Sequence, residues 1–240
     1  MKYVKMLGLA AAAVAALMAF VGASTASATV LCKVEGEKGA TGLTGTTCPA
    51  EKAYPKGTEI HAVLDPGTGP AKLTTAFKNI ECEESTVSGK TSNEGSATET
   101  VTGSVEVLTF GKCNCEVNVI KKGTLEVHWI NVLDKNENGE VIAETGGHNG
   151  TLTSNGAEVT AQCNTIFGAV HCIYVTENTD LGTATASGKN EKGEATPATM
   201  DIESANIPRL ATSGLCAETA KWDAKYEVTS PKPLYVAAHT

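Results

Sequence analysis

Eight cysteines have the most sharply defined chemistry in this chain, because thiols can pair as disulfides, ligate zinc or exchange electrons. Zinc knuckles separate paired cysteines by about two to four residues, whereas Cys113 and Cys115 have one residue between them. No thioredoxin-like helix start, which would lower a thiol pKa, follows this pair. We therefore expect structural disulfides rather than metal or redox chemistry. The eight residues are Cys32, Cys48, Cys82, Cys113, Cys115, Cys163, Cys172 and Cys216.

Sequence spacing narrows how these cysteines pair. A bridge between Cys32 and Cys48 would hold the polar segment 35–56, which has too few large apolar groups to order itself by burial. On the loop-closure model such a bridge contributes about 3 kcal/mol. Cys113 and Cys115 are two positions apart, so on a strand their side chains share a face and each needs a different partner.

The remaining cysteines allow two arrangements. Cys163 and Cys172 flank a segment that could turn at Gly168, and a bridge across that hairpin would leave Cys82 and Cys216 for Cys113 and Cys115. We favour this arrangement. The alternative pairs Cys172 with Cys216, and a weak internal repeat supports it.

A calcium-loop pattern begins at Asp134, where the sequence reads Asp-Lys-Asn-Glu-Asn-Gly. Oxygen ligands from Asp134, Asn136 and Asn138 around a glycine turn would suit a hard cation. The twelfth position, however, is Thr145 instead of a glutamate, and both flanks resemble strands. We therefore favour a hairpin tip with a tight Asn-Gly turn and expect no metal or other cofactor, with the calcium site as the alternative.

Catalytic motifs are not evident. The five histidines (His61, His128, His148, His171 and His239) show no zinc-protease spacing, and no G-x-S-x-G nucleophile elbow occurs. The adjacent Glu83 and Glu84 would point to opposite faces of a strand. We expect a protein that is not an enzyme, although carboxylates from distant strands could still form a hydrolase site. Trp129 and Trp222 could stack on a sugar, but a tryptophan in a strand is more often part of the core.

The elements that position these residues follow an export signal. Lys2 and Lys5 precede an apolar run, Leu7 to Val21, and Ala26-Ser27-Ala28 is a small-x-small cleavage site. This order is typical of a secretory signal peptide cleaved after Ala28. We expect a secreted chain with no membrane span after cleavage, in a compartment where thiols oxidise.

Residues 29–240 predict one all-β domain. Alternating apolar and polar residues with β-branched enrichment indicate strands, and helical periodicity is absent. The fold class we expect is an antiparallel β-sandwich or a partly closed barrel, stapled by disulfides. Polar Ser-Gly-Lys loops at 88–98 and 187–196, each followed by a cysteine, suggest half-repeats of about 50–140 and 141–240. The clear strand runs are 58–64, 104–110, 123–133, 170–176 and 222–229.

Charge limits the function classes. After cleavage the chain keeps 17 basic and 27 acidic residues, a formal net charge of −10. Such a surface repels nucleic acid and anionic membranes and favours a soluble monomer. We expect a non-enzymatic exported protein that is structural or binds an extracellular or cell-envelope partner, through loops 35–56, 88–99 and 187–197. The alternatives are a secreted hydrolase and a carbohydrate-binding module.

Overall fold

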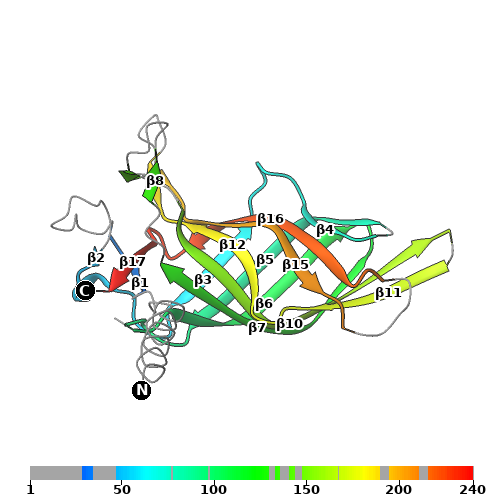
Figure 1. Ribbon diagram of the computed structural model, residues 1–240, viewed down its shortest axis with the longest axis horizontal. Coiled ribbons are helices and arrows are strands. Elements are labelled where there is room, and N and C mark those ends of the chain that lie inside the picture. Colours follow the sequence, from blue (N-terminus) through cyan, green and yellow to red (C-terminus); the bar gives the residue numbers. More distant parts are fainter. Residues whose placement is uncertain are drawn as a thin grey trace, which may run out of the picture.

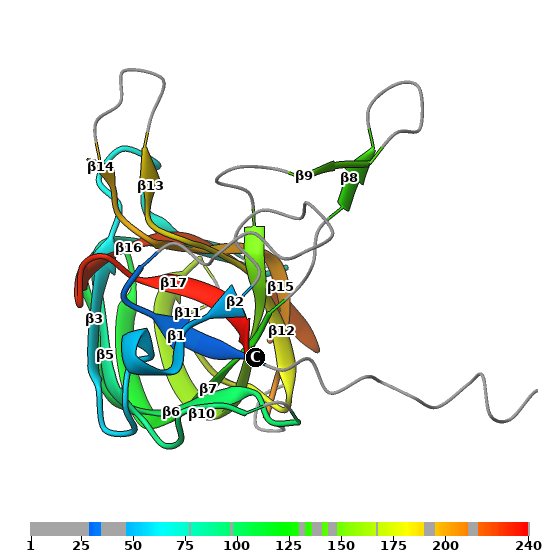
Figure 2. The same cartoon turned by 90° about the vertical axis from the view of Figure 1, so that its left-hand side faces the viewer.

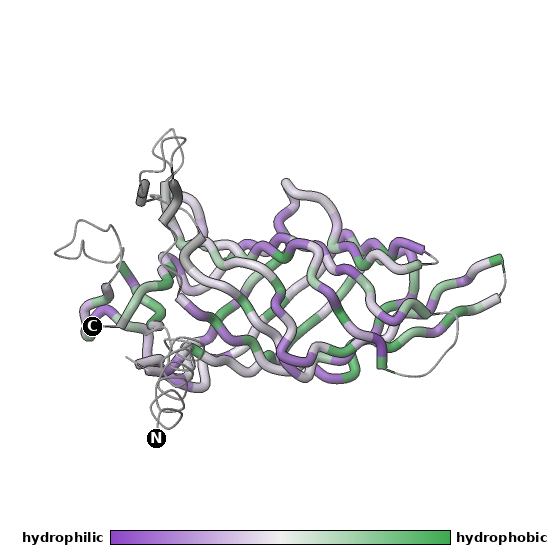
Figure 3. The backbone as a smooth tube through the Cα atoms, in the orientation of Figure 1, coloured by the Kyte–Doolittle hydropathy of each residue, from purple (hydrophilic) through white to green (hydrophobic). Residues whose placement is uncertain are grey.

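Alternation along the strand β16 (Thr219–Ser230) shows how the sequence builds this fold. Ala220, Ala224, Tyr226 and Val228 are buried, whereas the residues between them are partly or fully exposed. A period of two places the apolar set on one face, and that face must be covered by others like it. The computed structural model repeats the pattern along its long strands (Figure 3). It describes residues 29–34, 47–76, 78–96, 98–129, 133–135, 141–143, 148–166, 168–189, 195–210 and 216–239.

Eight long strands close into an antiparallel barrel (Figure 1). Each long strand pairs with the next long strand along the chain, including β7 with β10. The last long strand, β16, returns to pair with the first, β3. The all-β antiparallel prediction is confirmed, and the structure takes the barrel form because both edges of the sheet find a partner. In ring order the strands are β3 (Glu59–Leu64), β5 (Asn79–Thr91), β6 (Val101–Cys113), β7 (Glu116–Trp129), β10 (His148–Thr165), β12 (Thr179–Thr185), β15 (Thr199–Pro208) and β16.

Two short strands complete the wall where a long one ends. Strand β4 (Ala71–Thr74) follows β3 in the gap between β5 and β16. Strand β11 (Gly168–Val175) pairs with the second half of β10, beyond the residues that pair with β12. The amide of Leu210 donates to the carbonyl of Ile173 at 2.9 Å, which joins β11 to the segment after β15.

A small second sheet crosses one end of the barrel (Figure 2). It consists of β1 (Val30–Cys32), β17 (Tyr235–His239) and β2 (Thr47–Cys48), with β17 in the middle and the 3-10 helix η1 (Ala50–Lys52) beside it. Strand β1 precedes all the barrel strands in the sequence and β17 follows them all. The sheet therefore joins the N-terminal and C-terminal parts of the described chain. We call β1, β2, β17 and the adjoining residues 231–234 the lid.

Four disulfides staple the structure, and the described residues include no free cysteine. The predicted Cys32–Cys48 bridge is confirmed, and Cys113 and Cys115 indeed reach different partners. The bonds are Cys32–Cys48, Cys82–Cys113, Cys115–Cys163 and Cys172–Cys216.

The favoured Cys163–Cys172 bridge is wrong. In the β10–β11 hairpin Cys163 lies opposite Val170 and Cys172 lies opposite Ala161, so the two cysteines are diagonal neighbours. Diagonal positions lie about 7–8 Å apart, farther than the roughly 4.4–6.8 Å between Cα atoms of a disulfide. Cys172 instead bonds Cys216, as the alternative predicted.

Two short hairpins branch from the loops at the lid end. One pairs β8 (Leu133–Lys135) with β9 (Val141–Ala143), and the other pairs β13 (Gly188–Lys189) with β14 (Ala195–Thr196). Each half predicted from the repeat supplies four strands of the ring, although duplication itself stays a prediction. Among the described residues, no helix has the length and apolar character needed to cross a membrane.

Candidate ligand-binding cavities

The barrel interior beneath the lid is incompletely filled and leaves a cavity of about 100 Å³. Protein interiors normally contain few voids larger than a water molecule. Small residues such as Ala62, Ala184 and Ala198 stand in the wall where larger ones would fill the space. We call this cavity the aliphatic chamber. Its principal lining residues are Ile60, Val87, Leu125, Leu152, Met200 and Val228.

The lid closes the outer end of the aliphatic chamber. Leu31, Leu234 and Val236 project from it into the chamber lining and are buried there. Two reciprocal hydrogen bonds hold the lid to the barrel, since Ser187 donates its amide to the Leu234 carbonyl at 2.8 Å and its Oγ accepts the Leu234 amide at 2.9 Å. Access to the chamber from this end therefore depends on the packing of the lid.

A buried hydrogen bond separates this chamber from a second one. Tyr226 lies on β16 between Trp222, which lines the second chamber, and Val228, which lines the first. The Tyr226 hydroxyl oxygen is 2.8 Å from Oγ of Ser85. The Ser85 hydroxyl donates its own hydrogen to the carbonyl of Thr109. The Tyr226 hydroxyl is therefore the donor to Ser85. Burial raises the pKa of Tyr226, so the phenol stays neutral.

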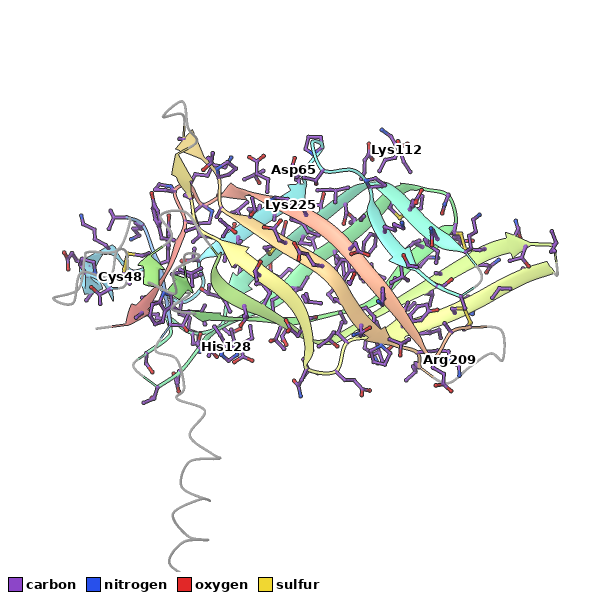
Figure 4. All side chains as sticks on the ribbon, turned by 45° about the horizontal axis from the view of Figure 1, so that its top comes forward. Cys48, Asp65, Lys112, His128, Arg209 and Lys225 are labelled. Atoms are coloured by element: carbon purple, nitrogen blue, oxygen red, sulfur yellow. A yellow bond between two sulfur atoms is a disulfide. The ribbon has the colours of Figure 1, made fainter. Side chains whose placement is uncertain are left out.

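The second cavity, of about 70 Å³, lies at the opposite end of the barrel from the lid. Figure 4 shows Cys48 of the lid toward one end of the barrel and Arg209 toward the other. We call this cavity the aromatic chamber. Its principal lining residues are Phe110, Val117, Val159, Tyr174, Ile207 and Trp222. The Trp222 ring makes edge contacts with Phe110 and Tyr226, at centroid distances of 6.4 and 6.5 Å.

Tyr174 gives the aromatic chamber its one unsatisfied polar group. The residue is 2% exposed, and its hydroxyl is the single buried side-chain polar atom among the described residues that lacks a hydrogen-bond partner. An unpaired buried hydroxyl costs about 1–3 kcal/mol. Burial raises the pKa of Tyr174, although the nearby Arg209 opposes the shift. The chamber thus contains a neutral phenol that can donate or accept one hydrogen bond.

The other lining hydroxyl, of Thr176, is already committed. Its Oγ1 lies 3.0 Å from Oγ of Ser154 and accepts the amide of Ala157 at 2.9 Å. The unpaired state of Tyr174 is therefore specific to that residue.

Both tryptophans considered for sugar stacking pack against the barrel core. Trp129 is the last residue of β7, and its amide donates to Oγ1 of Thr29 at 2.9 Å. In the calcium-loop pattern, Asn136 and Asn138 lie outside the described residues, as does the side chain of Asp134. Its backbone belongs to the β8–β9 hairpin. Among the described residues, no group of three or more His, Cys, Asp or Glu side chains is placed to hold a metal ion.

The proposed contact loops are described only in part. Residues 35–46 of loop 35–56 lie outside the described residues, as do residue 97 of loop 88–99 and residues 190–194 of loop 187–197. Within loop 88–99 the first four residues belong to strand β5.

The structure brings together one serine and one histidine that spacing did not reveal. His61 and Ser88 are cross-strand partners of β3 and β5, with Nδ1 2.8 Å from Oγ. His61 lies between the cavity-lining Ile60 and Ala62, so its side chain points out of the barrel. The Glu59 carboxylate is 3.8 Å from Nε2 and pairs with Lys90 at 3.2 Å. Among the described residues, therefore, no hydrogen-bonded carboxylate orients this imidazole as one orients the base of a catalytic triad.

An acidic groove on the outer wall is where the hydrolase alternative would act. It lies beside the loop that joins β3 to β4, near Asp65 and Lys225 (Figure 4). Two of its carboxylates are already bound: Asp201 pairs with Lys225 at 2.9 Å, and Asp223 accepts the amide of Ser204 at 2.8 Å. These interactions hold β15 and β16 together, which gives both carboxylates a structural role. Glu83 and Glu84 lie elsewhere and are exposed, with Glu84 2.5 Å from the Lys112 ammonium.

No family model, curated protein or solved structure matches this chain. Fold and site therefore define its class on their own: a disulfide-rich closed β-barrel with two apolar chambers. Four disulfides indicate an oxidising compartment.

Of the residues that shape the chambers, Trp222 was considered from sequence only for sugar stacking, and Tyr174 and Tyr226 were not singled out. Tyr226 and Trp222 stand in a run with clear alternation, which would have assigned them a common face. Tyr174 likewise alternates with Cys172 in the run 170–176. Nothing local to those runs shows that the interior they face contains empty space.

Proposed function

We propose that this protein is exported and binds a small, uncharged, apolar molecule in the aliphatic chamber. The observation that carries the proposal is the 100 Å³ cavity itself, whose surface beneath the lid is formed mainly by apolar atoms. An eight-stranded barrel is just wide enough either to be filled by its own side chains or to hold one small ligand. In this barrel the small wall residues leave the space unfilled.

The chemistry of the lining supports an apolar ligand. Transfer of a charged group from water into such a site would be strongly unfavourable without a partner charge. An apolar cavity of about 150 Å³ in another protein stays dry and binds benzene or xenon. The smaller aliphatic chamber suits xenon or a hydrocarbon of a few carbon atoms, and a longer molecule would displace the lid.

A binding role is favoured over a catalytic one. Among the described residues, those that line the aliphatic chamber include no carboxylate, imidazole or thiol. Export is supported by the leader-like sequence before residue 29 and by the four disulfides, which form in oxidising compartments.

Titration with xenon and n-pentane tests the proposal. We expect chemical-shift changes at the methyl groups of Leu152 and Val228. A pentane concentration ten times its Kd should raise the Tm by about 3–5 °C, because the ligand binds only the folded state.

Cavity-filling variants test the location of the site, and a substitution on the outer face of the barrel is their control. Ala62→Val and Ala198→Val add methyl groups to the chamber wall and should weaken pentane binding. Val63→Leu, on the exposed face of the same strand as Ala62, should leave it unchanged. Binding that ignores the filling variants, or the absence of any methyl shift, would overturn the proposal.

A further inference from the structure

Tyr174 marks the aromatic chamber as more than a gap in packing. It lies opposite Val159 across the β10–β11 pair, and cross-strand partners point to the same face of a sheet. Its ring therefore lines the chamber together with Val159. The hydroxyl is buried and has no hydrogen-bond partner among the described residues, whereas buried polar groups in proteins are nearly always paired.

A comparison with Tyr226 shows what is unusual. Both tyrosines are buried and face the barrel interior. The barrel supplies Ser85 as the partner of Tyr226, whereas none of the residues that the structure describes supplies a partner for Tyr174. The fold therefore satisfies one phenol internally and leaves the other available beside an empty space.

We infer that the aromatic chamber is a second binding site, which takes a small uncharged molecule with a compact apolar body and one oxygen atom that hydrogen-bonds to the Tyr174 hydroxyl. The apolar body packs against Phe110, Trp222 and Val117. Its single oxygen completes the hydrogen bonding of the phenol. This site is separate from the aliphatic chamber of the proposed function, because Tyr226 and Ser85 stand between them.

The size and polarity of the chamber select the ligand class. A void of about 70 Å³ suits a molecule of a few heavy atoms, such as a small ketone or alcohol. A charged ligand is disfavoured by the apolar walls. The guanidinium of Arg209 does not line the chamber, and its Nη1 donates to the Cys216 carbonyl at 2.5 Å.

Acetone and isobutene form the test pair, since isobutene replaces the carbonyl oxygen of acetone by a methylene group. Each is titrated into the full-length, disulfide-bonded protein and followed by NMR. We expect acetone to perturb the ring resonances of Tyr174 and Trp222. Tyr174→Phe should weaken acetone binding about fivefold to tenfold, which matches the loss of one hydrogen bond, and should leave isobutene binding unchanged or tighter.

Tyr226→Phe is the matched control, because it removes a phenol hydroxyl that already has an internal partner. It should leave acetone binding unchanged. Equal acetone affinity in the wild type and Tyr174→Phe would overturn the inference, as would acetone shifts confined to other parts of the protein. Failure of both probes to enter would also overturn it. The proposed function is read separately, from pentane at Leu152 and Val228.

Discussion

Tyr226 and Ser85 meet inside the barrel, with 2.8 Å between their hydroxyl oxygens, although their strands do not pair with each other. The Ser85→Ala variant leaves the Tyr226 phenol buried and unpaired, so it should lower the free energy of unfolding by about 1–3 kcal/mol. Tyr226→Phe should cost about 1 kcal/mol, because Ser85 keeps its bond to Thr109. Urea denaturation measures both. The exposed Ser92→Ala is the control, and a Ser85→Ala effect no larger than this control would contradict the assignment.

Alkaline pH should destabilise the fold through the same phenol. In the unfolded chain Tyr226 titrates near its ordinary pKa of 10.0, and burial raises the pKa in the folded protein. Its contribution to stability is therefore fully present below pH 10, and it is lost as the pH rises through the folded-state pKa. Over that interval each such group lowers the free energy of unfolding by about 1.4 kcal/mol per pH unit.

The Tyr226→Phe variant lacks this ionisable group. Its free energy of unfolding should therefore fall less steeply with pH, by the slope that corresponds to one proton. Short urea titrations between pH 9 and pH 12 measure the slope in the wild type and in the variant. Identical slopes would show that the phenol of Tyr226 ionises as easily in the folded protein as in the unfolded one.

Gly182 is required by the approach of two strands. Its φ is +132°, and a Cβ atom there would overlap the carbonyl oxygen of Asp201 on the neighbouring strand β15. Gly182→Ala should therefore cost about 3 kcal/mol or more, from backbone strain and steric overlap together. Gly168→Ala is the matched control, because its φ is +103° but a Cβ would meet open space. It should cost about 1–2 kcal/mol, and thermal unfolding compares the two.

Each disulfide should raise the free energy of unfolding by an amount that increases with the number of residues in the loop it closes. The Cys32–Cys48 bond spans 16 residues and the Cys115–Cys163 bond spans 48. Loop-closure entropy gives about 3 and 4 kcal/mol respectively, so paired alanine substitutions should lower stability in that order. Thiol titration of the denatured, unreduced protein should find no free cysteine, and any reactive thiol would contradict the four-bridge pattern.

Local alternation was enough to predict much of the barrel. The runs 58–64, 104–110, 170–176 and 222–229 all fall largely on strands of the structure. A period of two depends only on neighbouring residues, so it is legible without knowledge of the partner strand. The choice between sandwich and barrel was left open, because the closing pairs β7–β10 and β3–β16 depend on contacts between distant segments.

Register and empty space were beyond what spacing could predict. The mistaken Cys163–Cys172 bridge required two cysteines to be directly opposite, and the hairpin instead places them two residues out of register. The chambers depend on the combined volume of the side chains that all eight strands contribute to the interior. Ala62 and Ala198 are examples of small side chains that leave space there. The same packing determines that Ser85 meets Tyr226 and that the Tyr174 hydroxyl has no hydrogen-bond partner among the described residues.

The position of β17 has a consequence for biogenesis. This strand follows every barrel strand in the chain, and it is the strand to which β1 is hydrogen-bonded in the sheet. Because synthesis runs from the N-terminus, β1 is complete long before the strand with which it pairs exists. The lid, which covers one end of the aliphatic chamber, can therefore form only after all eight barrel strands have been synthesised.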